Sequence, residues 1–124
     1  MFAFLKPLLY IESVNFNKHY SLKKNYTIMR NKEICEMFVN NENGKYNGKK
    51  SNSMWISKDG DKIFSYGTCL AQRLSNGTIV VNTTKYSVTT SKQQGYLNYA
   101  LRWESTIPLT KDVPMWEKDL RMYL

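Results

Sequence analysis

The chain is poor in the side chains that most enzymes use for acid–base, nucleophilic or metal chemistry. Its 124 residues include one histidine, His19, and two cysteines, Cys35 and Cys69, which are far apart in the sequence. A Ser–His or Cys–His relay would depend on His19 alone, and a zinc site needs more ligands at closer spacing. No glycine-rich phosphate loop of known spacing occurs. We therefore predict a protein that is not an enzyme and that has no metal or cofactor.

Long hydrophobic runs are also lacking. The most apolar stretch, residues 1–14, is interrupted by Lys6 and Pro7. It has no basic start and no small-residue cleavage site, and it is too short to span a bilayer. We expect residues 2–14 to be extended, as one strand or as two short strands, and the protein to be cytoplasmic without membrane contact. A disulfide between the two cysteines is left open, because nothing shows an oxidising compartment.

Acidic residues are scarce in two long stretches. The formal net charge is +8, and residues 62–103 contain five basic residues and no acid. Residues 43–58 contain four lysines and again no acid. Such a charge distribution attracts polyanions such as nucleic acids. The alternative is that lysine is simply frequent in this chain and only aids solubility.

Length and composition indicate a single domain over residues 1–124, with 42% hydrophobic and 14% aromatic residues. Apolar residues at helical spacing predict a helix over 21–39, followed by a polar loop over 40–52. Residues 54–86 predict an antiparallel sheet with strands at 54–57, 62–74 and 78–86. Asn76-Gly77 suits a type I′ turn between the last two strands.

That turn predicts the register of the hairpin, with Leu74 opposite Ile79 and Gln72 opposite Val81. The predicted core face of the sheet then carries the bulky residues Phe64, Tyr66, Leu70, Leu74, Ile79 and Val81. The opposite face has smaller side chains, so that another element could approach it closely.

After the hairpin the period of the pattern changes and predicts a helix over 91–103. Its capping box is formed by Ser91 and Gln94 or, one residue earlier, by Thr90 and Gln93. We expect this helix to lie on the apolar face of the sheet with one stripe of residues, Tyr96, Tyr99, Ala100 and Trp103, and Gly95 to mark close packing. A short helix is predicted over 113–123. The fold class is α+β: a three-stranded antiparallel meander packed by a helix, plus an N-terminal helix and a short C-terminal helix.

The hairpin and the start of its helix carry a recognisable pattern. Ser65, Tyr66 and Thr68 with Leu70-Ala71 are followed by a polar turn, then by Tyr86-Ser87, and Thr89-Thr90-Ser91-Lys92 opens the helix. This unit resembles small uncharacterised proteins of bacteriophages and mobile elements. Gln93-Gln94 departs from a histidine-containing form of the motif, which argues against a histidine-based function. The resemblance implies a phage-type origin.

Three features could bind a partner: the hydroxyls and lysine at a helix start, aromatic residues among lysines, and a basic loop. Each also has a purely structural explanation, as a cap, as core or as a solvated loop. The predicted partner- or anion-binding residues are Lys45, Tyr46, Lys49, Lys50, Arg73, Lys85, Tyr86, Thr90, Ser91 and Lys92.

Two functions fit these features. The first is stoichiometric binding that inhibits a host nucleic-acid-handling defence complex, of the anti-CRISPR or anti-restriction type, with a host protein or nucleoprotein complex as the partner. The second is direct binding of DNA or RNA by a basic and aromatic surface.

Overall fold

The structure is a computed structural model, and it describes residues 29–124. It confirms the α+β class, with two α-helices and a mixed sheet of five strands. The helices are α1 (Asn31–Val39) and α2 (Val88–Ala100). The strands are β1 (Met54–Ile56), β2 (Lys62–Ser65), β3 (Thr68–Arg73), β4 (Ile79–Val81) and β5 (Thr106–Pro108), and the short 3-10 helices are η2 (Glu42–Gly44) and η3 (Leu120–Tyr123).

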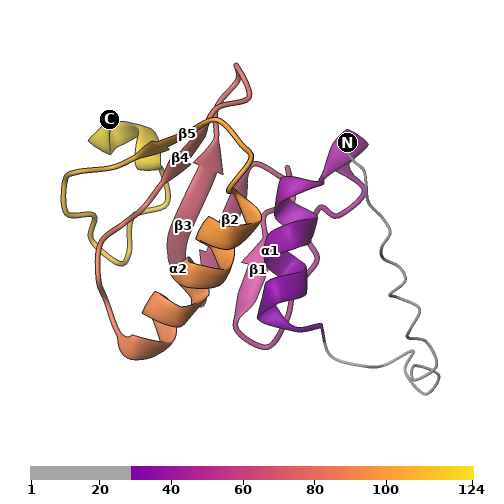
Figure 1. Cartoon of the computed structure of the whole chain (residues 1–124), viewed down its shortest axis with the longest axis horizontal. Helices are drawn as coiled ribbons and strands as arrows, with labels where there is room; N and C mark the ends of the chain where they lie inside the picture. Colours follow the sequence, from indigo (N-terminus) through magenta and orange to yellow (C-terminus); the bar gives the residue numbers. More distant parts are fainter. Residues whose placement is uncertain (1–28) are drawn as a thin grey trace.

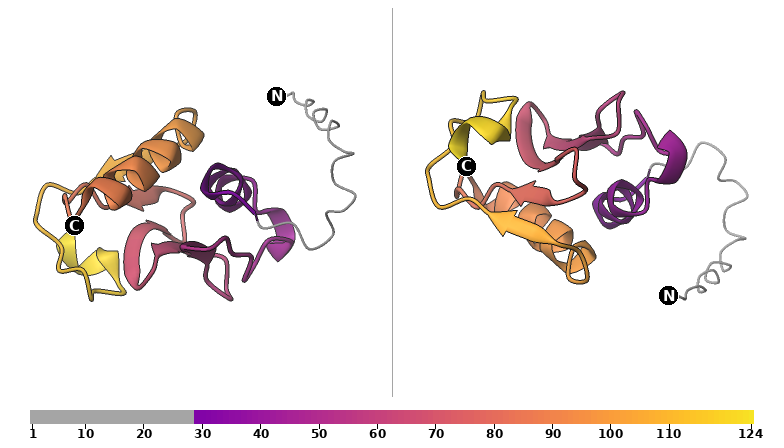
Figure 2. Two further views of the ribbon diagram at one scale, coloured as in Figure 1. Left: turned by 90° about the horizontal axis from the view of Figure 1, so that it is seen from below. Right: turned by 90° about the horizontal axis from the view of Figure 1, so that it is seen from above.

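The sheet has the strand order β1-β2-β3-β4-β5 (Figure 1). Neighbours from β1 to β4 are antiparallel, whereas β5 runs parallel to β4. A parallel neighbour needs a crossover, and α2 provides it on the same side of the sheet as α1 (Figure 2). The result is a three-layer arrangement, with helices on one side of the sheet and residues 109–124 on the other.

The helix side holds the larger core. Its fully enclosed side chains come from α1, from α2 and from the sheet, and they include Phe38, Ile63, Leu70, Ile79 and Leu97. The opposite side holds a smaller cluster. Its buried members are Phe64, Cys69, Val80, Leu109, Val113 and Leu120.

The predicted strand over 62–74 is in fact two strands. Ser65 pairs with Thr68, so the chain turns at Tyr66 and Gly67. Tyr66 adopts a positive φ of 55°, and its carbonyl accepts a hydrogen bond of 2.7 Å from Nε1 of Trp55. The prediction that Tyr66 belongs to the core is wrong: its side chain is 65% exposed, because a residue at the tip of a turn leaves the face of the sheet.

The predicted register of the next hairpin is wrong by one residue. Arg73 lies opposite Ile79, and Ala71 lies opposite Val81. Only Gly77 takes a positive φ in this turn, so the loop is longer than the two-residue type I′ turn. Because side chains alternate between faces, this shift places Leu74 on the side of residues 109–124, opposite to Ile79 and Val81. A register irregularity between Ile63 and Phe64 in the pairing of β2 with β3 places Phe64 on that side as well, while Leu70 lies on the helix side.

Strand β4 is also shorter than the predicted strand over 78–86. Asn82 ends it, because its amide donates to the carbonyl of Cys69 at 3.0 Å and its Oδ1 accepts from the backbone of Thr84 at 3.0 Å. Strand β5 was not predicted. Its three residues are exposed and include a proline. It pairs with β4 because the crossover through α2 brings it beside that strand.

The helices begin and end at other residues than predicted. Helix α1 covers the second half of the predicted helix over 21–39, and residues 21–28 lie outside the described residues, as does the predicted extended segment over 2–14. The predicted helix over 113–123 is wrong except for the turn η3. No helix within residues 29–124 is long and apolar enough to cross a membrane.

Helix α2 starts three residues earlier than predicted. Its cap is Ser87, whose hydroxyl oxygen accepts the backbone N–H of Thr90 at 3.1 Å, so neither predicted capping box forms. The expectation of close packing at Gly95 is also wrong, because a Cβ there would meet nothing within 4 Å.

Candidate nucleic-acid interface

Two buried amides determine which face of α2 meets the sheet. Gln93 accepts a hydrogen bond from the hydroxyl of Ser65 and donates one of 2.8 Å to the hydroxyl of Ser53. Gln94 donates to the carbonyls of Asn82 and Thr84 at 3.0 and 2.9 Å. Buried amides are stable only when they are bonded, so these contacts fix the rotation of α2 about its axis.

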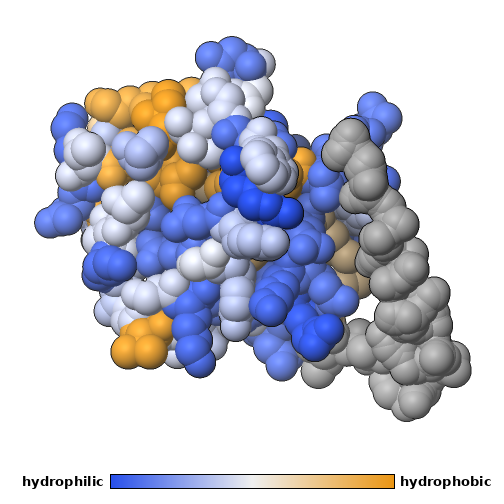
Figure 3. Space-filling model, viewed as in Figure 1, coloured by the Kyte–Doolittle hydropathy of each residue, from blue (hydrophilic) through white to orange (hydrophobic). Residues whose placement is uncertain are grey.

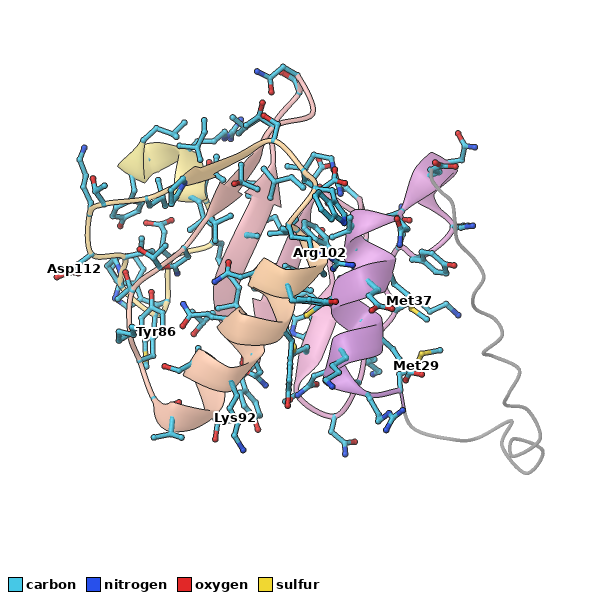
Figure 4. The ribbon with its side chains drawn as sticks, viewed as in Figure 1. Met29, Met37, Tyr86, Lys92, Arg102 and Asp112 are labelled. Atoms are coloured by element: carbon cyan, nitrogen blue, oxygen red, sulfur yellow. The ribbon has the colours of Figure 1, made fainter. Side chains whose placement is uncertain are left out.

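The opposite face of α2 therefore points to solvent. We use the name α2 surface for four exposed residues of α2 and of the turn that follows it: Lys92, Tyr99, Arg102 and Trp103. Trp103, in the turn that follows the helix, is 83% exposed, and Tyr99 is 64% exposed. Figure 4 shows Lys92 and Arg102 at opposite ends of the helix. The prediction that Tyr99 and Trp103 pack on the sheet is therefore wrong.

Arg102 organises the aromatic end of the α2 surface. Its guanidinium carbon lies 3.8 Å from the ring centroid of Tyr99 and 5.7 Å from that of Trp103. Its Nη1 donates to the carbonyl of Tyr99 at 2.6 Å, which holds the side chain against the helix. Residues 88–103 contain no acid, and Glu104 is the first one that follows. The surface thus combines two exposed rings with positive charge, as sequence-tolerant single-strand binders do.

The predicted basic loop is held against β1. Lys45, Lys49 and Lys50 are exposed, and the ammonium of Lys45 lies 5.1 Å from the ring centroid of Tyr46. Tyr46 itself is half-buried against the core of the helix side. The carbonyl of Lys49 accepts the N–H of Ile56 at 2.9 Å, so the backbone of this loop extends the sheet edge.

Arg73, Tyr86 and Thr90 have internal roles. The guanidinium of Arg73 donates to the carbonyls of Gly60 and Phe38 at 3.1 and 2.8 Å, and it covers the ring of Phe38. The hydroxyl of Tyr86 donates to the carbonyl of Val113 and accepts from Nδ2 of Asn82 at 2.9 Å. Thr90 lies in the first turn of α2, is buried, and donates its backbone N–H to the capping hydroxyl of Ser87.

The remaining predicted site residues lie in and before α2. Lys85 and Lys92 are exposed, and Ser91 is half-buried. With Ser87 as the cap, these residues do not surround a free helix end. Of the ten predicted site residues, Lys92 is the one that belongs to the α2 surface.

The described part of the chain offers little reactive chemistry. Cys35 and Cys69 are free and buried, and burial raises the pKa of each thiol to about 12. Neither is therefore an available nucleophile at neutral pH. Within residues 29–124, no group of three or more His, Cys, Asp and Glu residues could hold a metal ion. His19 lies outside the described residues.

Arg102 and Trp103 are not among the predicted site residues, because the aromatic stripe around them has the helical spacing typical of a core face. The buried stripe is instead Thr90, Gln93, Gln94, Leu97 and Leu101. These residues have helical spacing in the sequence, but Gln93 and Gln94 are polar, so the stripe does not look like a core face. The two leucines at 97 and 101 were the signal that could have identified it.

The chain matches no protein-family model, and no curated protein or solved structure is significantly similar to it.

Proposed function

We propose that the protein binds nucleic acid directly through the α2 surface, with unpaired bases stacking on Trp103 and Tyr99. The observation that carries this proposal is the exposed stack of Tyr99, Arg102 and Trp103 at the end of α2, in a stretch, residues 88–103, that contains no acid. Arg102 and Lys92 would neutralise phosphates at the two ends of the helix. Stacking works with any base, so binding would depend on single-strandedness more than on sequence.

The test compares variants of two positively charged regions, the α2 surface and the basic loop that contains Lys49 and Lys50. Binding of a labelled single-stranded oligonucleotide is measured by fluorescence anisotropy at several salt concentrations. Trp103→Ala should weaken binding about tenfold, since stacking on one ring contributes about 1–3 kcal/mol. Arg102→Gln should reduce the slope of log K against log salt by about 0.7, the value for one phosphate contact.

The matched control is the double change Lys49→Gln and Lys50→Gln in the basic loop. These lysines are exposed and lie outside the α2 surface, so the change should leave stacking unaffected. If the loop variant loses more affinity than Trp103→Ala, the loop is the interface and the α2 surface is not. Absence of any salt-dependent binding by the unchanged protein would end the proposal.

A second candidate is stoichiometric binding to a host defence complex, as the phage-type resemblance of the hairpin implies. A different surface favours it. Figure 3 shows an apolar area over β5 and the C-terminal turn, and Ile107, Met122 and Leu124 are 40%, 73% and 55% exposed. Exposed apolar patches are typical of protein–protein contacts. A partner that co-purifies with the protein in high salt, and is lost with Met122→Glu, would support this function over the first.

A further inference from the structure

A pocket of about 330 Å³ lies where the start of α1 meets the middle of α2. Its described lining consists of Arg30, Asn31 and Lys32 from α1 and the residue before it, and of Tyr96 from α2. The two helices lie side by side in both Figure 1 and Figure 2. A volume of this size is at the lower end of the range for small-molecule sites.

The lining combines one aromatic ring with two cations. The ammonium of Lys32 lies 5.6 Å from the ring centroid of Tyr96, and Tyr96 is half-buried with its ring against the core. Glu33 is the nearest acid in the sequence, and its Oε1 accepts the backbone N–H of Arg30 at 2.8 Å. That carboxylate is therefore engaged at the helix start, and no described lining residue is acidic.

Asn31 in the lining of the pocket is linked by hydrogen bonds to the buried amide of Gln93 in α2. Oδ1 of Asn31 accepts hydrogen bonds from Ser51 at 2.6 Å and from Ser53 at 3.3 Å. Ser53 in turn accepts from Gln93, which precedes Tyr96 by one turn. This chain of bonds fixes the start of α1 relative to α2, and therefore the backbone positions from which the two cations and the ring extend.

We infer that this pocket binds one nucleotide, with the base stacked on Tyr96 and its phosphate between Arg30 and Lys32. The inference rests on the proposed function for its class of ligand. Tyr96 lies one turn from both Lys92 and Tyr99, so a strand on the α2 surface can place one base in the pocket. The pocket would then favour strands with an unstacked base and would also bind a free nucleoside monophosphate.

The experiment titrates the full chain with adenosine monophosphate and with adenosine, and follows binding by isothermal calorimetry. The monophosphate should bind about tenfold more tightly, because its phosphate gains charge-assisted hydrogen bonds. Lys32→Gln should remove most of this difference and leave adenosine unchanged. Lys58→Gln, an exposed lysine in the turn between β1 and β2, is the matched control and should change neither.

Tyr96 is tested with two variants, because its ring also packs on the core. Tyr96→Leu should weaken the binding of both ligands about tenfold. Tyr96→Phe should bind both as tightly as the unchanged protein does, because it keeps the ring face on which the base stacks. Equal affinity for both ligands, or no effect of Lys32→Gln and Tyr96→Leu on binding, would overturn the proposal that this pocket binds a nucleotide.

The same variants separate the two proposals. Oligonucleotide binding without monophosphate binding would refute the proposed nucleotide site and leave the proposed binding on the α2 surface intact. Monophosphate binding that depends on Lys32 and Tyr96, without oligonucleotide binding, would support the pocket and refute the α2 surface.

Discussion

On one side of the sheet two helices bury a continuous apolar layer, whereas on the other side residues 109–124 have little regular structure. That segment is held by hydrogen bonds between side chains of the sheet side and its own backbone groups. The hydroxyl of Thr83 donates to the carbonyl of Leu109 at 2.8 Å, and the N–H of Leu120 donates to Oε1 of Gln72 at 2.8 Å. A segment without a helical or strand pattern can therefore still be ordered when the sheet offers fixed polar partners.

The largest expected effect concerns the helix side. Phe38→Ala should lower the free energy of unfolding by about 3–5 kcal/mol, because a fully buried ring leaves a cavity. It also removes the ring beneath Arg73. Urea unfolding followed by circular dichroism measures the change. Leu120→Ala on the other side should cost less, about 2 kcal/mol, since the irregular segment can relax into the space. An equal loss of stability at the two positions would show that the irregular segment is packed as rigidly as the helix side.

A smaller effect is expected at the polar attachment of the C-terminal segment. Tyr86→Phe removes the hydroxyl that links Asn82 to Val113, and should cost about 1 kcal/mol. Because the lost hydrogen bond holds residues 109–124, its removal should make local opening of this segment more frequent. Cys69 lies beneath this segment, and Cys35 lies on the helix side.

Thiol labelling followed by mass spectrometry measures this opening. Burial raises the pKa of both thiols to about 12, so each reacts only when it becomes exposed. In Tyr86→Phe the labelling rate of Cys69 should rise about fivefold while that of Cys35 stays constant. Tyr123→Phe is the matched control, because its hydroxyl donates to Glu117, a residue of the same C-terminal segment. A parallel rise at both cysteines would show that the two sides open together.

The smallest effect is expected at the end of the chain. The hydrogen bond from the Arg121 side chain holds the pKa of Asp119 well below its usual range. This carboxylate therefore stabilises the fold above its ordinary pKa of 3.8, and the contribution is lost only as the pH falls below that value. Asp119→Asn should destabilise the protein slightly at neutral pH and not at strongly acidic pH. Urea unfolding at the two pH values tests this, and a difference that persists in acid would contradict it.

Local patterns predicted several elements well. The α+β class, the second half of the first predicted helix and most of α2 follow from periodicity. The register of the second hairpin does not, because Asn76-Gly77 suits more than one loop length. Strand β5 depends on a neighbour that is distant in sequence, and three exposed residues give no pattern of their own.

The candidate site was predicted less well than the fold. Lys92 is exposed on the α2 surface, and its role in binding stays a prediction. Arg73 and Tyr86 donate to backbone carbonyls inside the molecule. A basic or aromatic residue looks the same in a sequence whether it faces solvent or bonds a carbonyl from another segment. Only the neighbours separate the two cases.

By itself the sequence determined the charge of the protein, the scarcity of reactive side chains and the α+β class, since these follow from composition and short-range periodicity. The tertiary structure decided which face of α2 is exposed. Gln93 and Gln94 can be buried only because Ser53, Ser65 and Asn82 supply hydrogen bonds from distant segments. With those amides inward, the rotation of the helix places Tyr99, Arg102 and Trp103 in solvent, where a ligand can reach them.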